Sequence, residues 1–214
     1  MIRPGDRVLI ATRNKGKTRE FREAFAALGA AVTDLNEWRG PEIPPIAEDG
    51  ATFADNARIK ARAVAEAAGI AALADDSGLC VDALGGAPGV YSARYAGEGA
   101  TDADNNAKLL RELARANASA EAADSGAGPR LLSPARFVCA LVLYDPASGA
   151  EFSAEGVLEG YIVGAPSGGG GFGYDPLFWL PAFGRTLAEL SVDEKNRISH
   201  RGQALERLLR LLRP

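Results

Sequence analysis

The chain has 214 residues, of which 47% are hydrophobic and 24% charged, a composition typical of a soluble globular protein. Its 24 Lys and Arg and 28 Asp and Glu give a formal net charge of −4, which disfavours a protein that coats nucleic acid. One histidine, His200, and two cysteines, Cys80 and Cys139, are too few for a structural zinc cluster and make a disulfide framework implausible. We therefore expect both cysteines to be buried thiols, and any metal to be a hard ion held by carboxylates.

The N-terminal segment does not fit a signal peptide, because residues 1–7 are polar and the apolar run after them is short. No stretch approaches the roughly 20 apolar residues that a membrane-spanning helix needs. These features predict a cytoplasmic protein without a membrane partner.

The first half of the chain alternates apolar runs of strand length with segments of helical periodicity. Capping residues such as Thr52 and terminating glycines such as Gly29 and Gly69 mark the helix ends. In chain order, the pattern predicts a strand at 8–12, a helix at 17–28, a strand at 30–35, a loop at 40–50, a helix at 52–69, a strand at 70–74 and a helix at 101–115.

The second half predicts two paired strands, at 136–144 and 151–158, and an amphipathic helix at the C-terminus. Residues 117–134 are rich in Ala, Ser, Gly and Pro and predict an exposed loop within a single domain of residues 1–214. Alternating elements followed by a strand pair indicate an α/β chain with a mixed sheet. Ligand sites in such folds lie where strands end in loops.

The loop after the first strand, residues 11–18, nearly spells a P-loop, with Ala11 in the first glycine position. The apolar run 71–75 resembles a Walker B strand, so a P-loop NTPase or kinase is one alternative. Against it, the loop interior of residues 12–15 has large side chains, whereas a P-loop offers backbone N–H groups to phosphate. A plain strand–helix turn with solvated lysines is another alternative, although Lys17 at the helix start is well placed to meet an anion.

An acidic cluster, Asp75-Asp76-Ser77-Gly78, follows the predicted strand at 70–74, and Glu48 lies upstream in a loop. Carboxylates at strand ends hold Mg²⁺ in many proteins, usually together with water and substrate phosphates. A turn in which the aspartates act as caps is the simpler alternative. Together with Lys17, Lys60 and Lys195, however, the cluster favours a site for a triphosphate and magnesium.

Six motifs in one order, running from residue 8 to the C-terminal helix, resemble the inosine/xanthosine triphosphate pyrophosphatase family, which removes non-canonical purine nucleotides. The motifs are Thr12-x-Asn14-x-x-Lys17, Thr52-Phe-x-x-Asn56-Ala-x-x-Lys60-Ala, Asp75-Asp-Ser-Gly-Leu79, the segment 85–97, Gly171-Phe-Gly-Tyr-Asp-Pro176 and Ser199-His-Arg-Gly-Gln-Ala204. The chain departs from the family at Arg13, where glycine is common, and in the length of the loop at 117–134.

The resemblance implies an elongated α/β fold whose central mixed sheet is flanked by helices, with two lobes around a substrate cleft. It also implies a homodimer that requires Mg²⁺ and cleaves ITP, dITP or XTP to the monophosphate and pyrophosphate. By position, Asp76 matches the proton acceptor and a metal ligand, and Glu48 the second metal ligand. The implied substrate-binding residues are Thr12, Arg13, Asn14, Lys15, Gly16, Lys17, Asn56, Lys60, Ser77, Phe172, Gly173, Tyr174, Asp175, Lys195, His200 and Arg201.

Within this set, we expect Thr12 to Lys17 and Ser77 on the phosphate side and the C-terminal residues on the base side. His200 and Arg201 could donate to the oxygen at C6 of inosine or xanthine, which adenine replaces with an amino group. Phe172 could stack on the purine. Two alternative functions stay open. One is a nucleotide-binding regulator without catalysis, and the other is the activity of the septum-associated nucleotide pyrophosphatases, which have a similar architecture. At residue level, His200 could be a helix cap and Phe172 a core residue.

Overall fold

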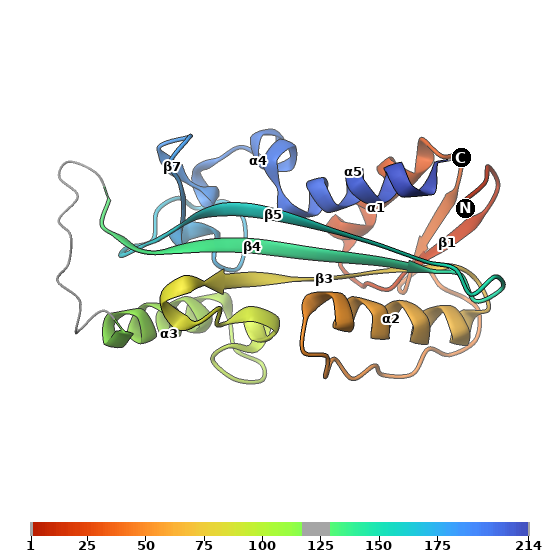
Figure 1. The fold of residues 1–214 in the computed structure, drawn as a ribbon, viewed down its shortest axis with the longest axis horizontal. Coiled ribbons are helices and arrows are strands. Elements are labelled where there is room, and N and C mark those ends of the chain that lie inside the picture. Colours follow the sequence, from red (N-terminus) through yellow and green to blue (C-terminus); the bar gives the residue numbers. More distant parts are fainter. Residues whose placement is uncertain (1, 117–128, 214) are drawn as a thin grey trace. The chain divides into compact units, whose positions relative to one another are not determined.

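The computed structural model describes residues 2–116 and 129–213 (Figure 1). The strands and α-helices are, in chain order, β1 (Arg7–Ile10), α1 (Lys15–Ala26), β2 (Ala31–Asp34), α2 (Phe53–Ala68), β3 (Ala72–Val81), α3 (Asp102–Ala116), β4 (Leu131–Tyr144), β5 (Glu151–Val163), β6 (Phe178–Leu180), β7 (Arg185–Thr186), α4 (Val192–Ile198) and α5 (His200–Leu212). Short 3₁₀ turns lie at 82–84, 89–94, 175–177 and 187–189. No helix in the described ranges is both long and apolar enough to cross a membrane.

The strands form one mixed sheet in the order β2-β1-β3-β4-β5-β6-β7. β1 pairs in parallel with β2 on one side and with β3 on the other, whereas β6 pairs antiparallel with β5 and β7. The sheet is flanked by helices, so the predicted α/β class is confirmed. Because the chain leaves β1 for β2 and then returns to β3 on the opposite side, the carboxyl end of β1, beside the first residues of β3, is where such sheets bind ligands.

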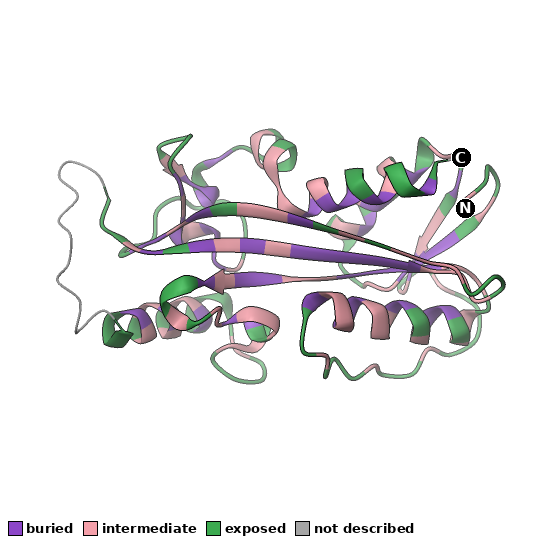
Figure 2. Ribbon diagram, in the orientation of Figure 1, coloured by how far each residue is buried: buried purple, intermediate pink, exposed green. Residues whose placement is uncertain are grey.

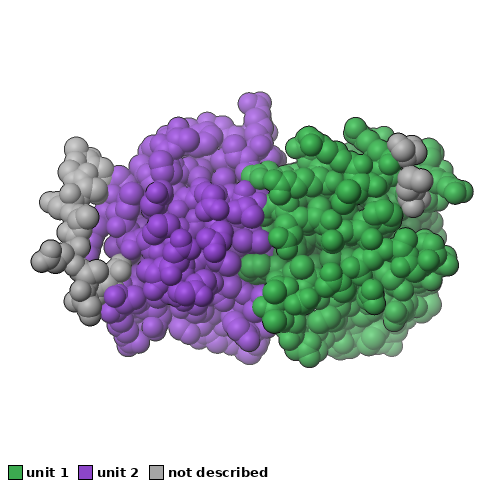
Figure 3. Space-filling model, viewed as in Figure 1, with its two compact units in different colours: residues 1–76, 139–156, 201–214 green, residues 77–138, 157–200 purple. Residues whose placement is uncertain are grey.

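The chain divides into two compact units (Figure 3). Unit 1 comprises residues 1–76, 139–156 and 201–214, and unit 2 comprises residues 77–138 and 157–200. Strands β3, β4 and β5 contribute residues to both units. The substrate cleft between two lobes stays a prediction, and each unit is described below by itself.

The core of unit 1 has two sides, because successive residues of a strand point to opposite faces of the sheet. Val8 and Ile10 pack in a cluster with Phe21 of α1 and Leu208 of α5, whereas Leu9 packs with Val64 of α2. Figure 2 shows the buried stripe along α2 that faces the strands. Helices α1 and α5 on one face and α2 on the other thus cover β1, which leads into the loop at residues 11–14.

The core of unit 2 forms where α3 packs with residues of β3, β4 and β6. Leu109 and Leu113 of α3 cluster with Leu79 of β3, Phe137 of β4 and Phe178 of β6. All five side chains are at most 8% exposed. This core holds α3 and the segment before β6, which both contribute to the site described below.

Local signals predicted several boundaries well. The Thr52 hydroxyl accepts a hydrogen bond from the Asp55 N–H at the start of α2, and Gly69 ends the helix with φ of +69°. The predicted loop at 117–134 differs at its end, because β4 already begins at Leu131, while residues 117–128 lie outside the described residues. Strands β6 and β7 and helix α4 were not predicted.

The acidic cluster is also placed differently from the prediction, since Asp75 and Asp76 lie inside β3 and not in a turn after it. β3 pairs with β1 only as far as Leu73, so both carboxylates lie just beyond the end of its neighbour. The cysteines are both free thiols, but only Cys139 is buried; the prediction of a buried Cys80 was wrong, because Cys80 is partly exposed.

Candidate functional site

The turn from β1 into α1 is held by its own side chains. The Asn14 side-chain oxygen accepts hydrogen bonds from the N–H groups of Gly16 (2.9 Å) and Lys17 (3.1 Å), and the Thr12 hydroxyl accepts one from the Asn14 N–H (3.2 Å). Asn14 is therefore the N-cap of α1. The same N–H groups would bind phosphate in a P-loop, so this capping disfavours the P-loop alternative.

The position of Arg13, where the family commonly has glycine, requires no special backbone conformation. Among the described residues, every residue with positive φ is a glycine. The Arg13 guanidinium donates to the Leu35 carbonyl at 3.3 Å, and the Arg13 backbone carbonyl accepts from the Asn36 side-chain amide at 3.0 Å. The segment after β2 thus supports this turn from the side.

Asp75 is the centre of a buried charge network in unit 1. Its carboxylate accepts from the Lys17 ammonium at 2.8 Å and from Nε of Arg201 at 3.2 Å, and its side chain is 3% exposed. Burial by itself would raise the pKa of Asp75, but the charges of Lys17 and Arg201 outweigh it and lower the pKa to about 2. Asp75 therefore stays ionised and fixes Lys17 at the start of α1.

Asp76 points to a second group of charges. Nζ of Lys60 lies 3.6 Å from an Asp76 oxygen and 3.1 Å from a Glu48 oxygen, so one ammonium contacts both carboxylates. The Asn56 amide donates to the other Asp76 oxygen at 3.1 Å, while the Asn56 carbonyl accepts from the Gly50 N–H. Asn56 thereby ties the loop that carries Glu48 to β3.

The pKa of Asp76 is raised, unlike that of its neighbour. Burial is the largest cause, and the like charges of Glu48 and Asp75 add to it, whereas Lys60 and Asn56 act in the opposite direction. The pKa values of these two adjacent carboxyl groups are thus shifted in opposite directions. Asp75 is a fixed anion, and Asp76 is the better proton acceptor.

A cavity of about 590 Å³ in unit 1 lies against these residues. Three basic side chains, of Arg13, Lys17 and Lys60, and three acidic ones, of Glu42, Glu48 and Asp75, line it. We call this the charged cavity. Its remaining lining includes Thr12 and the apolar segment 43–46, which belongs to the long loop before α2.

Unit 2 contains a smaller cavity of about 150 Å³, which we call the aromatic cavity. Phe137, Phe172, Tyr174 and His200 contribute to its lining. The rings of Phe137 and His200 are stacked, with centroids 5.1 Å apart and planes at 13°. The Tyr174 side chain is 4% exposed, and its hydroxyl donates to the Ser92 carbonyl at 2.8 Å.

Phe172 differs from the other aromatic residues of this cavity, because it is 63% exposed. The Lys195 ammonium lies 4.6 Å from the centre of its ring, a cation–π contact. Asp175, which is buried, forms an ion pair with Lys195 and accepts a hydrogen bond from the Phe172 N–H at 2.9 Å. An exposed ring beside a part-buried ion pair is a suitable surface for stacking a flat ligand.

The structure places the predicted residues in two groups, one in each unit. Ser77, predicted on the phosphate side, lines the aromatic cavity of unit 2. Arg201, predicted to contact a purine base, instead contacts Asp75 and lies 3.5 Å from Glu20 in unit 1. Lys15 is exposed at the first position of α1.

Two residues of these networks had no predicted role of their own, although Asp75 belongs to the predicted acidic cluster. Asp75 pairs with two cations, Lys17 and Arg201, and Phe137 stacks on the His200 ring. A signal for Asp75 was present, because two adjacent acids in an otherwise apolar strand must point to opposite faces and each needs a partner.

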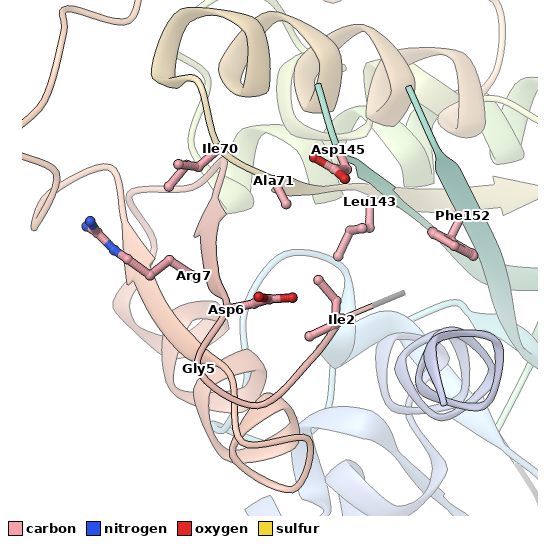
Figure 4. A pocket seen from close by; sticks show the side chains of 9 residues that line it. All are labelled: Ile2, Gly5, Asp6, Arg7, Ile70, Ala71, Leu143, Asp145 and Phe152. Carbon is pink, nitrogen blue, oxygen red and sulfur yellow. The ribbon is translucent and has the colours of Figure 1, made fainter. Parts of the chain in front are cut away.

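A further cavity of about 390 Å³ in unit 1 contains none of the predicted residues (Figure 4). Apolar side chains such as Ile2, Leu143 and Phe152 line it together with Asp6 and Asp145. Both carboxylates accept hydrogen bonds from nearby backbone N–H groups. This cavity is smaller than the charged cavity, and Arg7 is its single basic residue where the charged cavity has three.

The chain matches the Ham1 family model over residues 8–211 and belongs to the Ham1 family. This confirms, at the level of the family, the resemblance drawn from the six motifs. A curated relative from Streptococcus pyogenes serotype M18 (strain MGAS8232), named dITP/XTP pyrophosphatase, is 49% identical over 205 residues, which cover 96% of this chain and 58% of the relative. The chain thus spans a little under three fifths of the length of the curated relatives it matches.

Solved structures match over nearly their full length. A HAM1 protein from Coxiella burnetii is 42% identical, with a TM-score of 0.84 over 97% of this chain and 98% of that one. A protein from Mycobacterium abscessus, described as a nucleoside-triphosphatase or dITP/XTP pyrophosphatase, is 41% identical, with a TM-score of 0.75 over 97% of this chain and all of that one.

Proposed function

We propose that the chain hydrolyses the non-canonical purine triphosphates ITP, dITP and XTP to the monophosphate and pyrophosphate. The observation that carries this proposal is the charged cavity, in which three cationic and three carboxylate side chains gather next to the carboxyl end of β1 and the first residues of β3. Anionic phosphates need the cations, and a metal ion that accompanies them needs the carboxylates. The names of the relatives from Streptococcus and Mycobacterium support the substrate class.

The donor set fits Mg²⁺ as the proposed cofactor. In the part of the chain that the structure describes, no group of three or more His, Cys, Asp and Glu side chains forms a cage for a metal ion. Mg²⁺ does not need one, because it usually binds one or two carboxylates, water and substrate phosphates. Asp76 and Glu48 already share one cation, the Lys60 ammonium, so their oxygens are suitably placed to hold the ion. When bound, it would neutralise phosphate charge and polarise the reacting phosphate.

The chain's own residues perform the remaining steps of the proposed reaction. The raised pKa of Asp76 suits it to orient a water molecule and accept its proton during attack on the α-phosphorus. Lys17 and Lys60 offset the charge of the departing pyrophosphate. Arg201 acts indirectly, because it holds Asp75, which in turn fixes Lys17.

We assign the purine base to the aromatic cavity. Phe172 offers an exposed ring for stacking, and a His200 N–H can donate to the oxygen at C6 of hypoxanthine or xanthine. Adenine carries an amino donor at that position, so ATP would leave a donor facing a donor and bind poorly. Arg201 is not part of this assignment, since its guanidinium is paired with Asp75.

Two further properties follow from the family resemblance and remain proposals. The protein is a homodimer, and it acts in the cytoplasm, where the nucleotide pool is made and used. Neither property contributes to the assignment of residues above.

The proposed function is tested by measuring pyrophosphate release from ITP, XTP, GTP, ATP and a modified pyrimidine triphosphate, each with and without Mg²⁺. We expect rapid release from ITP and XTP with Mg²⁺, and little from ATP. Equal kcat/KM for ATP and ITP would overturn the proposal. A preference for the modified pyrimidine triphosphate would favour the septum-associated pyrophosphatase activity in its place.

A further inference from the structure

The backbone around Phe172 has an unusual conformation that glycines on both sides allow. Gly171 and Gly173 have φ of +76° and +61°, in the left-handed region. A side chain at Gly171 would place its Cβ only 2.1 Å from an Asp175 oxygen. Because the Phe172 ring is largely exposed, its direction depends on this backbone more than on packing around the ring.

Two side chains of α3 hold this backbone from outside the loop. Asp102 accepts a hydrogen bond from the Gly173 N–H at 2.6 Å, and the Asn106 amide donates to the Gly173 carbonyl at 2.9 Å. The two residues are four apart and therefore lie on one face of the helix. Together they pair both backbone polar groups of Gly173, the residue directly after Phe172.

Neither side chain forms the cap of the helix. The start of α3 is capped by Thr101, whose hydroxyl accepts from the Asp104 N–H, while Asp104 accepts in return from the Thr101 N–H. Asn105 shows what a structural amide looks like here, because its oxygen accepts from the Ala96 N–H and its nitrogen donates to the Ala93 carbonyl.

Asn106 contrasts with its neighbour. Its side-chain oxygen is buried and has no hydrogen-bond partner among the residues that the structure describes. A buried, unpaired oxygen destabilises a protein, so an amide at this position is unfavourable for folding alone. The nitrogen of the same amide donates to the Gly173 carbonyl. This contact with the loop, and not the stability of the fold, accounts for an amide at position 106.

We propose that Asp102 and Asn106 are positioning residues that hold the Phe172 ring in place for stacking with the purine base. Both act through the backbone of Gly173, and Asp102 also contributes to the lining of the aromatic cavity. The inference rests on the proposed function, in which Phe172 contacts the base. It assigns to α3 a part in substrate affinity that its sequence does not show.

The test compares Asp102→Ala and Asn106→Ala with the conservative Asp102→Asn, whose amide oxygen can still accept from Gly173. Asp104→Ala is the matched control, because it removes an acid and the cap of the same helical turn without touching the loop. The measured quantities are kcat and KM for ITP, melting temperature, and amide hydrogen exchange over residues 171–175 in the substrate-free protein.

We expect Asp102→Ala and Asn106→Ala to raise KM for ITP about tenfold with kcat changed less than about threefold, the pattern of lost binding energy. Hydrogen exchange over 171–175 should speed up in both. Asp102→Asn should restore KM close to the wild-type value. Asp104→Ala should lower the melting temperature and leave KM and loop exchange unchanged.

The inference is overturned if both alanine variants match Asp104→Ala in KM and in loop exchange. A wild-type protein that releases no pyrophosphate from ITP would instead contradict the proposed function. Hydrogen exchange then decides the positioning role by itself: faster exchange in Asp102→Ala than in Asp104→Ala supports it, and equal exchange overturns it.

Discussion

The two units of the chain hold their site residues by different interactions. In unit 1, charged side chains pair with one another, as Lys17 and Arg201 do with Asp75. In unit 2, side chains mostly hold backbone, as Asp102 and Asn106 do at Gly173 and Tyr174 does at the Ser92 carbonyl. The Lys195–Asp175 ion pair beside Phe172 is an exception.

This difference matches the chemistry of the two parts of a nucleotide. Charges can be buried only when they are paired, and in unit 1 Lys17 and Lys60 each have a carboxylate partner. In the proposed function, the phosphates and the metal ion meet cations and carboxylates that are already held in place. A purine base is flat and uncharged, and it needs a ring held at a fixed angle, which backbone hydrogen bonds provide.

The largest expected effect concerns Asp76. Asp76→Asn removes the proton acceptor while keeping the size of the side chain, so kcat for ITP should fall by about a hundredfold to ten-thousandfold, the usual contribution of a general base. Asp82→Asn is the control, since Asp82 lies outside the charged cavity, paired with Arg136. Steady-state pyrophosphate release measures both, and the melting temperature checks that both fold. Retention of more than about a tenth of wild-type kcat by Asp76→Asn would remove this assignment.

The next effect is on stability and contrasts the buried network with a surface ion pair. Asp75→Ala leaves the charges of Lys17 and Arg201 without their shared partner, which should lower the free energy of unfolding by about 3–5 kcal/mol. Asp82→Ala breaks the pair with Arg136, whose side chain is 41% exposed, and should cost at most about 1 kcal/mol. Urea unfolding at pH 7 gives both values. If the two variants lose the same stability, the buried network in unit 1 does not differ from a surface pair.

The aromatic cavity should respond in substrate affinity. Phe172→Ala removes the exposed ring, and loss of stacking with a base should raise KM for ITP about tenfold to a hundredfold with little change in kcat. Phe183→Ala, at another exposed phenylalanine of unit 2, is the matched control. A fall in kcat with an unchanged KM would place Phe172 in the chemical step and would contradict the division between the units.

The sequence predicts an element well where the interactions that form it lie within one short segment, and poorly where they join distant residues. The helix at 53–68 was predicted closely, because its apolar face, the cap at Thr52 and the final Gly69 lie within one short segment. The continuation of β3 through Asp75 was not, because a buried carboxylate is stable there only with Lys17 and Arg201, which lie 58 and 126 residues away in the sequence.

The site shows the same limit. Motif order identified Lys17, Asp76 and Lys60, whose charged groups the structure brings to the neighbouring networks of unit 1. It could not separate His200 from Arg201, which are adjacent in the sequence but belong to different units. Residues such as Asn106 act through another residue's backbone, so no pattern of residue types reveals them.

The smallest expected effect concerns charges outside both cavities. Glu151 pairs with Arg58 (2.8 Å) and Arg62 (3.0 Å), yet both arginine side chains are more than a third exposed. Glu151→Gln should therefore lower the free energy of unfolding by less than about 1 kcal/mol at pH 7. Glu66→Gln, at an exposed position of α2, is the control for the same change in net charge.

The sign of the pH dependence sharpens this last prediction. Burial by itself would raise the pKa of Glu151, but hydrogen bonds from Arg58 and Arg62 outweigh it and lower the pKa. The carboxylate therefore stabilises the fold above its unfolded pKa of about 4.3, and this contribution is lost as the pH falls through the lower folded value. The difference in urea-unfolding free energy between wild type and Glu151→Gln should be present at pH 7 and shrink as the pH falls below about 4. A difference as large as that expected for Asp75→Ala would mean that exposed ion pairs hold unit 1 together as firmly as the buried network does.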